Sequence, residues 1–311
     1  MSVLPRAAAL TERLPRFLRR HRLMTSWMRL TGESPIQLVR VRDDSLAYAD
    51  MSDGFLRLIP IDGGYDEDFF IVADALLSEG GTFLDVGANY GLLSFGLAGR
   101  HGDRIDFHLF EPNTALTRTI GRSRARYPAM RCTVNAVAVS DRPGTVRFSL
   151  DEAQTGASHI STADEAGTVE VPAIALDGYI AANGITRVDL LKLDIEGFEA
   201  SACRGAEKSL RSRLIRAVYY EYFEKCLIRA GEPGKLIEYL DGLGFVTCFC
   251  RRYDLECFGG PTHTVADGLP GHGLKLLPVE GLERPAMTDL LAIPRENLVP
   301  RGGARRDRSQ P

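Results

Sequence analysis

Through the middle of the chain, short runs of almost only apolar residues take turns with runs in which apolar residues recur at helical spacing. Six short, nearly all-apolar runs predict buried strands, at 82–87, 104–112, 131–140, 187–194, 214–222 and 245–250. Runs with helical spacing of apolar residues follow four of them, at 91–100, 114–127, 198–210 and 234–244. Buried strands that alternate with helices are typical of a parallel sheet covered on both faces. We therefore predict an α/β fold with ligands at the carboxyl ends of the strands.

The two ends of the chain differ from this pattern. Short alternating runs over 36–60 predict a small β-meander, and a helical run over 66–81 ends at two glycines. Residues 13–30 interleave arginines with large apolar side chains, as in a basic amphipathic helix. Such a helix either packs on the domain, which we favour, or contacts a membrane surface. We expect three parts: an N-terminal extension over 1–64, the main domain over 65–260, and a C-terminal extension over 261–311 with a disordered end.

Composition narrows the class of protein. The 311 residues carry a net charge of −3 and are 44% hydrophobic, which is ordinary for a globular protein and shows no bias toward nucleic acid. No apolar run reaches the length of a membrane span, and the N-terminus lacks the apolar segment of a secretory signal. We therefore expect a cytoplasmic protein whose six cysteines are reduced thiols. Cys248, Cys250 and Cys257 cluster, but their spacing fits a strand better than a metal site.

The first predicted strand leads into a glycine-rich turn, "FLDVGANYGLLS". Dinucleotide-binding folds use G-x-G-x-x-G, which lets backbone amides approach a pyrophosphate. Here Gly87 and Gly91 flank the polar Asn89, and Asp85 precedes the turn. A carboxylate would repel a pyrophosphate but suits a cofactor with an ammonium group and no phosphate. S-adenosylmethionine (SAM) has those properties.

The second predicted strand ends in "HLFEPN", with Glu111 at its tip. An acidic residue at this position accepts hydrogen bonds from both ribose hydroxyls of a nucleoside cofactor. This role suits NAD as well as SAM, so Glu111 alone does not decide between them.

Three blocks of the chain resemble the FkbM family of class I SAM-dependent methyltransferases: "FLDVGANYGLLS", "FEPN" with "VNAVAVSDRPGTVRF", and "ALDGYI" with "VDLLKLDIEGFEASACRGA". The resemblance implies a Rossmann-like, mostly parallel sheet, here with a small helical and β-meander extension at the N-terminus. It implies methyl transfer from SAM, usually to a hydroxyl of a sugar or another small molecule. It also assigns cofactor roles to Asp85, Gly87, Asn89, Gly91 and Glu111, and places adenine near Asn135 and Ala136.

The acceptor side of the site is less defined. Asp194 and Glu221 end two neighbouring predicted strands, so their carboxylates are expected near the transferring methyl group. Either could take a proton from a hydroxyl, and together with Glu196 they could bind Mg²⁺, although no dedicated metal site is evident. His159 is a third candidate base. It lies in an insertion with hairpin-like runs at 144–150 and 167–176, where a histidine is more often an ordinary polar loop residue.

Two classes of function fit these features. The first is a SAM-dependent O-methyltransferase for a glycan or small hydroxylated acceptor, with no nucleic-acid partner. The second is a non-catalytic SAM-fold protein that acts at a membrane or in a complex. An intact cofactor loop and intact carboxylates at the strand ends favour the enzyme. A dehydrogenase is a distant third, because the glycine spacing is wrong for a pyrophosphate.

We predict that the protein binds SAM and does not bind NAD, because Asn89 stands where a pyrophosphate loop has its middle glycine and the Asp85 carboxylate precedes the turn. Isothermal titration calorimetry with each cofactor checks this. Tight binding of NAD without binding of SAM would contradict the interpretation of the loop.

Overall fold

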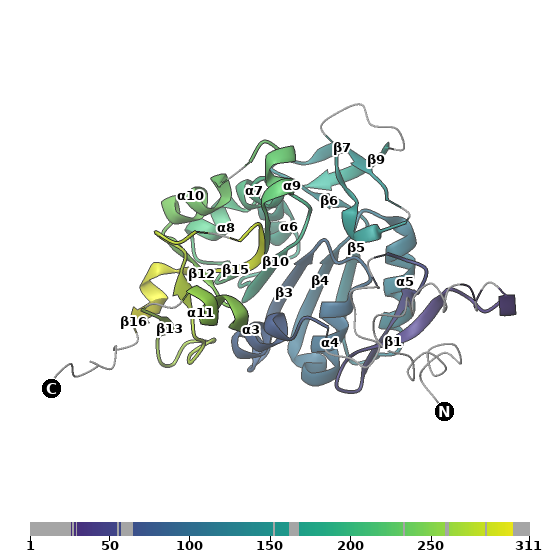
Figure 1. The fold of residues 1–311 in the computed structure, drawn as a ribbon, viewed down its shortest axis with the longest axis horizontal. Helices are drawn as coiled ribbons and strands as arrows, with labels where there is room; N and C mark the ends of the chain where they lie inside the picture. The colour runs from purple at the N-terminus through teal and green to yellow at the C-terminus, as the bar shows by residue number, and fades with distance from the viewer. Residues whose placement is uncertain are drawn as a thin grey trace.

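A computed structural model describes residues 26, 28, 30–54, 56, 65–151, 153–161, 168–232, 234–258, 261–283 and 285–300. Among them, eight strands form one central sheet in the order β14-β12-β15-β11-β10-β3-β4-β5 (Figure 1). Four neighbouring pairs are parallel, and they join β5 (Arg131–Asn135), β4 (Ile105–Phe110), β3 (Gly81–Val86), β10 (Leu190–Leu193) and β11 (Val218–Phe223). The predicted parallel sheet is thus confirmed for this half.

The other half of the sheet is antiparallel and reaches beyond the boundary expected at residue 260. It consists of β15 (Met287–Pro294), β12 (Phe245–Phe249) and β14 (Leu277–Pro278). Because β15 pairs with both β11 and β12, residues of the expected C-terminal extension form an inner strand of the main domain. The predicted boundary is therefore too early. A strand whose partners lie 40 to 70 positions away has no local signal that shows which sheet it joins.

Helices cover both faces of the sheet (Figure 1). Alternation along β3 separates two cores, since Phe83 belongs to one apolar cluster and Leu84 to the other. The Phe83 side packs against α3 (Glu67–Leu77), α4 (Leu92–His101) and α5 (Thr114–Arg124). The Leu84 side packs against α6 (Leu176–Ala182), α7 (Glu199–Arg204), α8 (Glu207–Arg211) and α10 (Lys235–Gly242).

The predicted strand over 131–140 is two strands. β5 ends at Asn135, and the chain then leaves the central sheet to form β6 (Ala138–Val139). β6 belongs to a separate four-stranded sheet with β9 (Thr168–Ile174), β7 (Gly144–Ser149) and β8 (His159–Ile160). The predicted hairpin runs of the insertion are β7 and β9, which pair antiparallel.

The helix predicted over 198–210 is also two elements, α7 and α8, with Gly205 between them. A Cβ atom on Gly205 would lie 2.2 Å from the carbonyl oxygen of Ser140, so the chain passes close to the strand that leaves the sheet. This long-range contact does not appear in the apolar spacing that predicted one helix.

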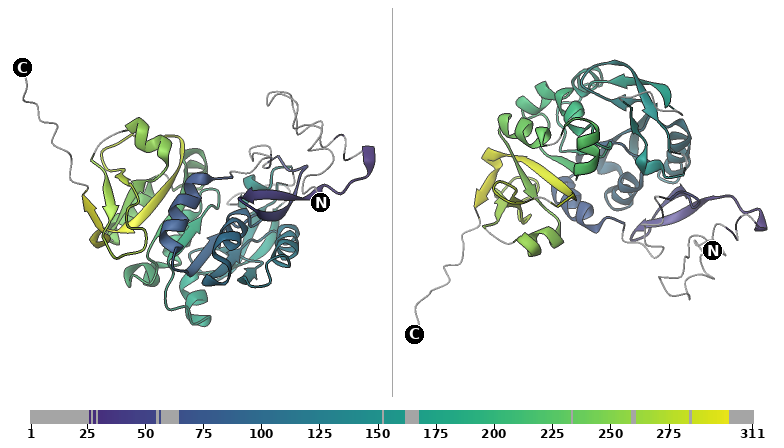
Figure 2. Two further views of the ribbon diagram at one scale, coloured as in Figure 1. Left: turned by 90° about the horizontal axis from the view of Figure 1, so that it is seen from below. Right: turned by 45° about the horizontal axis from the view of Figure 1, so that its top comes forward.

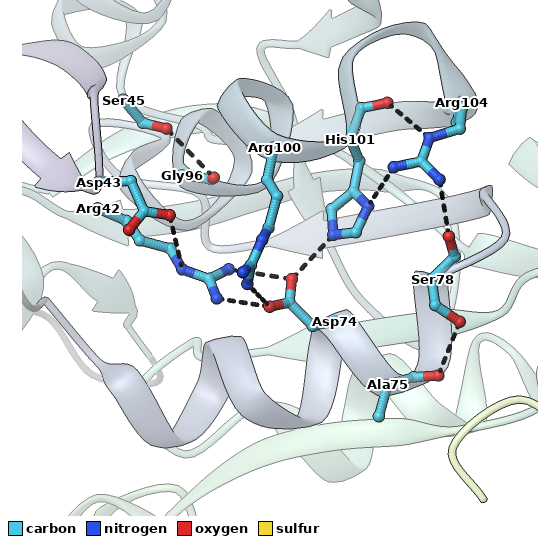
Figure 3. Close-up of polar contacts among 10 residues, drawn as sticks. All are labelled: Arg42, Asp43, Ser45, Asp74, Ala75, Ser78, Gly96, Arg100, His101 and Arg104. Atoms are coloured by element: carbon cyan, nitrogen blue, oxygen red, sulfur yellow. Dashed lines mark hydrogen bonds and ion pairs between the residues drawn. The ribbon is translucent and has the colours of Figure 1, made fainter.

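The N-terminal extension docks through a charged contact at Asp74 of α3 (Figure 3). Its carboxylate accepts hydrogen bonds from Arg42 of β1 (Ile36–Arg42) and from Arg100 of α4, and one oxygen lies 2.8 Å from Nε2 of His101. Burial alone would raise the pKa of Asp74, but the bonds from His101 and Arg42 hold it below its ordinary value. β1 pairs antiparallel with β2 (Ser45–Asp50), and Figure 2 shows this pair at the opposite end of the molecule from the C-terminal strands.

Several predictions fall on residues outside the described ranges. They are most of the basic amphipathic helix of 13–30, most of the end of the meander at 55–60, and the C-terminal tail after residue 300. Of residues 13–30, only Ser26, Met28 and Leu30 are described. Contact of residues 13–30 with a membrane stays a prediction. Among the helices that the structure describes, none is long and apolar enough to cross a bilayer.

The remaining elements are short. They are α9 (Glu224–Arg229), α11 (Arg252–Phe258), β13 (His263–Val265) and β16 (Leu298–Pro300). All six cysteines are free thiols, as predicted. Cys248 is buried in β12, whereas Cys257 is exposed on α11, so the three clustered cysteines do not converge on one site.

The packing of α3 generates a stability prediction. Phe69 is 0% exposed, and its ring packs edge-on against Tyr219 with the centroids 5.2 Å apart. Phe69→Ala should lower the free energy of unfolding by about 3–5 kcal/mol, because it leaves a cavity in the core. Urea unfolding measures the change. Ile71→Ala, on the exposed side of the same helix, is the matched control and should change stability by no more than about 0.5 kcal/mol. Equal losses for the two variants would contradict the assigned core.

Candidate active site

A cavity of about 330 Å³ opens at the carboxyl edge of the parallel strands. Residues at or just after the carboxyl ends of β3, β4, β10 and β11 line it, together with five residues of the insertion between 154 and 160. The carboxyl edge of a parallel sheet is where such folds bind ligands. The structure therefore brings half of the predicted site residues to one cavity: Gly87, Asn89, Glu111, Asp194 and Glu221.

The loop after β3 has the backbone shape that its glycines predict. Gly87, Asn89 and Gly91 all have positive φ, at 75°, 53° and 72°. At Gly87 a Cβ atom would also lie 1.9 Å from the carbonyl oxygen of Asp194, so no side chain fits there. The loop ends at Gly91, which precedes the first turn of α4. Glycine is thus needed at positions 87 and 91 for two reasons: the turn requires positive φ, and the Asp194 backbone after β10 lies too close to Gly87 for a side chain.

Glu111 faces the cavity from the end of β4. Its two carboxylate oxygens accept backbone N–H bonds from Asn89 and Asn113, each at 2.9 Å. Burial raises the pKa of Glu111 to about 7, even though these two bonds favour the charged form. A carboxylate has about four acceptor positions, so each oxygen can still accept a hydroxyl. This geometry fits the predicted ribose contact.

Asp85 lies below the loop rather than in the cavity. It is 1% exposed and is not among the residues that line the cavity. One oxygen accepts a hydrogen bond of 2.6 Å from Ser94 Oγ, and the other lies 3.4 Å from Nζ of Lys192. Asp85, expected to supply negative charge near the cofactor's ammonium, is thus enclosed and paired with Lys192.

Lys192 stands inside the apolar strand β10 and links both sides of the site. Its Nζ lies 3.4 Å from Asp194 Oδ2 as well as from Asp85, and it donates to the carbonyl of Gly87 at 2.8 Å. Burial lowers the pKa of Lys192, but Asp194 and Asp85 raise it by more, and the net shift is upward. The pairing of Lys192 with a neighbouring carboxylate is a structural role.

The two residues predicted to lie near adenine, Asn135 and Ala136, do not face the cavity. Asn135 turns its amide to the carbonyl of Leu109 and the hydroxyl of Tyr179, and Ala136 is exposed. Neither lines the cavity. Val137, Ala138 and Val139 line it instead, because the chain leaves the sheet after β5 and passes across the cavity wall. With Phe110 they form an apolar surface suited to a flat ring.

Three carboxylates meet the cavity at its other end: Asp194, Glu196 and Glu221. Glu196 has a positive φ of 56° and accepts a hydrogen bond from the Cys226 thiol. The pKa of Glu221 is raised by burial and then by the negative charges of Asp194 and Glu196. Like charges that share a site resist ionising together, so this end of the cavity holds a proton readily.

Glu199 supports this end from below. It is 1% exposed in the first turn of α7, and its Oε1 accepts the N–H groups of Ile195 and Gly197 at 3.0 and 3.2 Å. Burial raises the pKa of Glu199 to about 7. The side chain thus shapes the turn that carries Glu196.

His159 is not among the residues that line the cavity, although Ser158 and Ile160 on either side of it are. Its Nδ1 lies 3.0 Å from the carbonyl oxygen of Ala157. The structure therefore gives no support for His159 as the base. Within the described ranges, no group of three or more His, Cys, Asp or Glu residues is arranged to hold a metal ion.

Sequence reasoning missed several lining residues. Thr155 and Gln154 come from the insertion, Tyr65 precedes α3, and Met287 starts β15. Within the insertion, the sequence had singled out only His159 as a candidate site residue. Met287 lies in a region without a recognisable motif, and only the sheet pairing brings it to the cavity.

The position of Glu111 generates a prediction about pH. A pKa of about 7 lies above the ordinary 4.5, so Glu111 is mostly protonated at pH 6 and ionised at pH 8. Ribose hydroxyls need the ionised form as acceptor. Affinity for S-adenosylhomocysteine (SAH) should therefore rise about tenfold from pH 6 to pH 8. Calorimetry at several pH values measures this.

Glu111→Gln should bind more weakly and lose the pH dependence. Glu199→Gln is the control, because the Glu199 carboxylate faces backbone N–H groups and not the cavity, and it should keep the rise. A rise that survives in Glu111→Gln would assign the titration to another group.

Comparison with known proteins identifies the family. A family model described as "Methyltransferase FkbM domain" matches residues 85–247, more than half of the chain. A search of curated proteins returns no match. Similar solved structures include a SAM-dependent O-methyltransferase from Thermotoga maritima (12% identity, 86% of this chain and 80% of that one, TM-score 0.39). They also include a precorrin-6y C5,15-methyltransferase from Geobacter metallireducens (11% identity, 72% of this chain and 84% of that one, TM-score 0.35). A third is an rRNA methylase from Streptococcus thermophilus (9% identity, 74% of this chain and 97% of that one, TM-score 0.37). The chain belongs to the FkbM family of SAM-dependent methyltransferases.

Proposed function

We propose that the protein transfers the methyl group of SAM to a hydroxyl of an uncharged sugar or another small hydroxylated molecule. The observation that carries this proposal is the pair of carboxylates, Asp194 and Glu221, at the end of the cavity next to the cofactor loop. The Asp194 carboxylate can accept the proton that a hydroxyl loses when it is methylated, and the Glu221 carboxyl can form a hydrogen bond with the acceptor. They favour an enzyme over a protein that only binds SAM.

The orientation of the cofactor follows from the lining residues. Glu111 takes the ribose hydroxyls, and the apolar wall of Phe110, Val137 and Val139 takes adenine. The amino-acid end then lies along the loop from Gly87 to Gly91. This leaves the sulfonium and its methyl group facing Asp194, where an acceptor can approach in line with the carbon–sulfur bond.

SAM, held by the Gly87–Gly91 loop and Glu111, would supply the methyl group to the acceptor oxygen and would leave as SAH. The hydroxyl proton moves to a carboxylate oxygen of Asp194. The Nζ of Lys192 lies 3.4 Å from Asp194 Oδ2, so the two side chains form an ion pair beside the acceptor. Glu221, whose pKa is raised, holds a proton at neutral pH and can donate a hydrogen bond to the acceptor.

The charge of the acceptor end favours an uncharged substrate. Among the described residues that line the cavity, Lys192 is the only cation, and it is already paired with two carboxylates. An acceptor with a phosphate or carboxylate would meet Asp194, Glu196 and Glu221, and Arg229 beside them is already paired with Glu196 at 3.8 Å. Phe223 and the half-exposed Met287 add an apolar rim that suits the face of a sugar ring. These features also argue against nucleic acid as the acceptor.

Asp194→Asn keeps the shape of the side chain and removes the charge. Turnover on the true acceptor should fall by at least about 10²-fold, the lower end for losing a positioned base, while SAH affinity stays within about threefold. Release of SAH in a coupled assay measures turnover, with extracts from the protein's source as acceptors. Near-normal turnover in Asp194→Asn would contradict the role of Asp194.

Two comparisons sharpen this experiment. Glu221→Gln should reduce turnover less than Asp194→Asn does. Glutamine can still donate a hydrogen bond to the acceptor as the protonated Glu221 does, although it has no carboxyl proton. EDTA on the wild-type protein separates a direct base from a bound Mg²⁺ ion that acidifies the hydroxyl. Loss of activity that Mg²⁺ restores would favour the metal, and no effect would favour the direct base.

A further inference from the structure

The carboxylate of Asp53 connects three segments that are far apart in the sequence. Asp53 follows β2 in the N-terminal extension, outside the family match at 85–247, and is 3% exposed. One oxygen, Oδ2, accepts bonds from the hydroxyls of Tyr90 at 2.8 Å and of Thr155 at 2.6 Å. The other accepts the backbone N–H of Thr155 at 3.2 Å. Tyr90 belongs to the cofactor loop, and Thr155 to the insertion.

These bonds hold the insertion over the cofactor cavity. Next to Asp53, the backbone N–H of Gly54 donates to the carbonyl of Ala153 at 2.8 Å. Gln154, Thr155 and Gly156 then line the cavity directly. A segment outside the family match, at Asp53 and Gly54, thus positions a wall of the cofactor site.

The hydroxyl of Thr155 has one proton and lies among the side chains of Asp53, Asn89 and Tyr90, and Tyr90 donates its own proton to Asp53. It lies 2.6 Å from Asp53 Oδ2 and 3.1 Å from the oxygen position of the Asn89 amide. A carboxylate only accepts hydrogen bonds, so the hydroxyl proton goes to Asp53. The Thr155 oxygen must then accept from Asn89. Amide oxygen and nitrogen are assigned from the hydrogen-bond network, and this network places the NH₂ group of Asn89 toward Thr155.

This orientation leaves the amide oxygen of Asn89 as an acceptor in the cavity. Asn89 lines the cavity, and the other end of its amide makes no hydrogen bond to any residue that the structure describes. The amino-acid end of SAM brings an ammonium group that needs acceptors. Asp85, which the sequence suggested for that role, is buried and paired with Lys192.

We propose that Asp53 is a positioning residue for the cofactor: through Thr155 it orients the Asn89 amide so that the amide oxygen receives the ammonium of SAM. The inference rests on the proposed function only in that the cavity binds SAM, and it is independent of the acceptor. Asp53 itself does not touch the cofactor.

A pair of ligands separates this role from general support of the fold. SAH carries the amino-acid end, whereas 5′-methylthioadenosine has the same adenosine part without it. Asp53→Asn should weaken SAH binding about tenfold, the low end for a hydrogen bond to a charged group, and change 5′-methylthioadenosine binding less than about twofold. Calorimetry on the full-length protein measures both, and a thermal melt checks that the variant is folded.

Thr155 supplies a second, independent pair of variants. Thr155→Val removes the hydroxyl at constant shape and should reproduce the selective loss, whereas Thr155→Ser keeps the hydroxyl and should bind SAH like the wild type. Asp44→Asn is the control in the same extension, because Asp44 is exposed in the turn between β1 and β2. If Asp53→Asn does not fold, the two Thr155 variants decide.

Equal weakening of both ligands would make the contact a general support of the cavity and overturn the proposal, as would unchanged SAH binding in Asp53→Asn and Thr155→Val. Wild-type protein that binds neither ligand would overturn the cofactor assignment and this inference together. Failure to methylate a hydroxyl, by contrast, would count against the proposed acceptor and leave the ligand comparison intact.

Discussion

The ammonium group of Lys192 lies buried between the carboxylates of Asp85 and Asp194, 3.4 Å from an oxygen of each. It joins the ends of β3 and β10 and donates to the carbonyl of Gly87. Charges in such a place are tolerated only when they are paired, and removing one partner of a buried pair costs about 3–5 kcal/mol. The contacts of Lys192 with Asp85, Asp194 and Gly87 therefore fix the start of the cofactor loop where it leaves β3.

This pairing gives the two aspartates different tasks. Asp85 is enclosed, and its second oxygen accepts a bond from Ser94 in the first turn of α4. Asp194 keeps 44% of its side chain exposed and faces the cavity. One lysine thus connects a carboxylate that supports the loop with one that can meet an acceptor. The close approach of the Asp194 carbonyl to Gly87 adds a steric reason for the same arrangement.

The cavity is completed by segments outside the family match. Met287 reaches it because β15 pairs with β11, and Asp53 supports it through Tyr90 and Thr155. The matched region supplies the cofactor loop, Glu111 and the carboxylates of the acceptor end. The added segments provide walls and orientation, which are the parts of a methyltransferase site that can differ while the transfer chemistry stays the same.

The sequence by itself determined the parts of this protein that depend on neighbouring residues. The order of strands and helices, the positive φ values of Gly87 and Gly91, and Glu111 at a strand end all follow from local spacing and from the freedom of glycine. Only the tertiary structure decided that Lys192 neutralises Asp85, that Val137 and not Asn135 lines the cavity, and that β15 enters the sheet. Each of these depends on contacts between segments far apart in the chain. Such contacts arise when the two cores pack and the strands pair, and no periodicity along a single segment contains them.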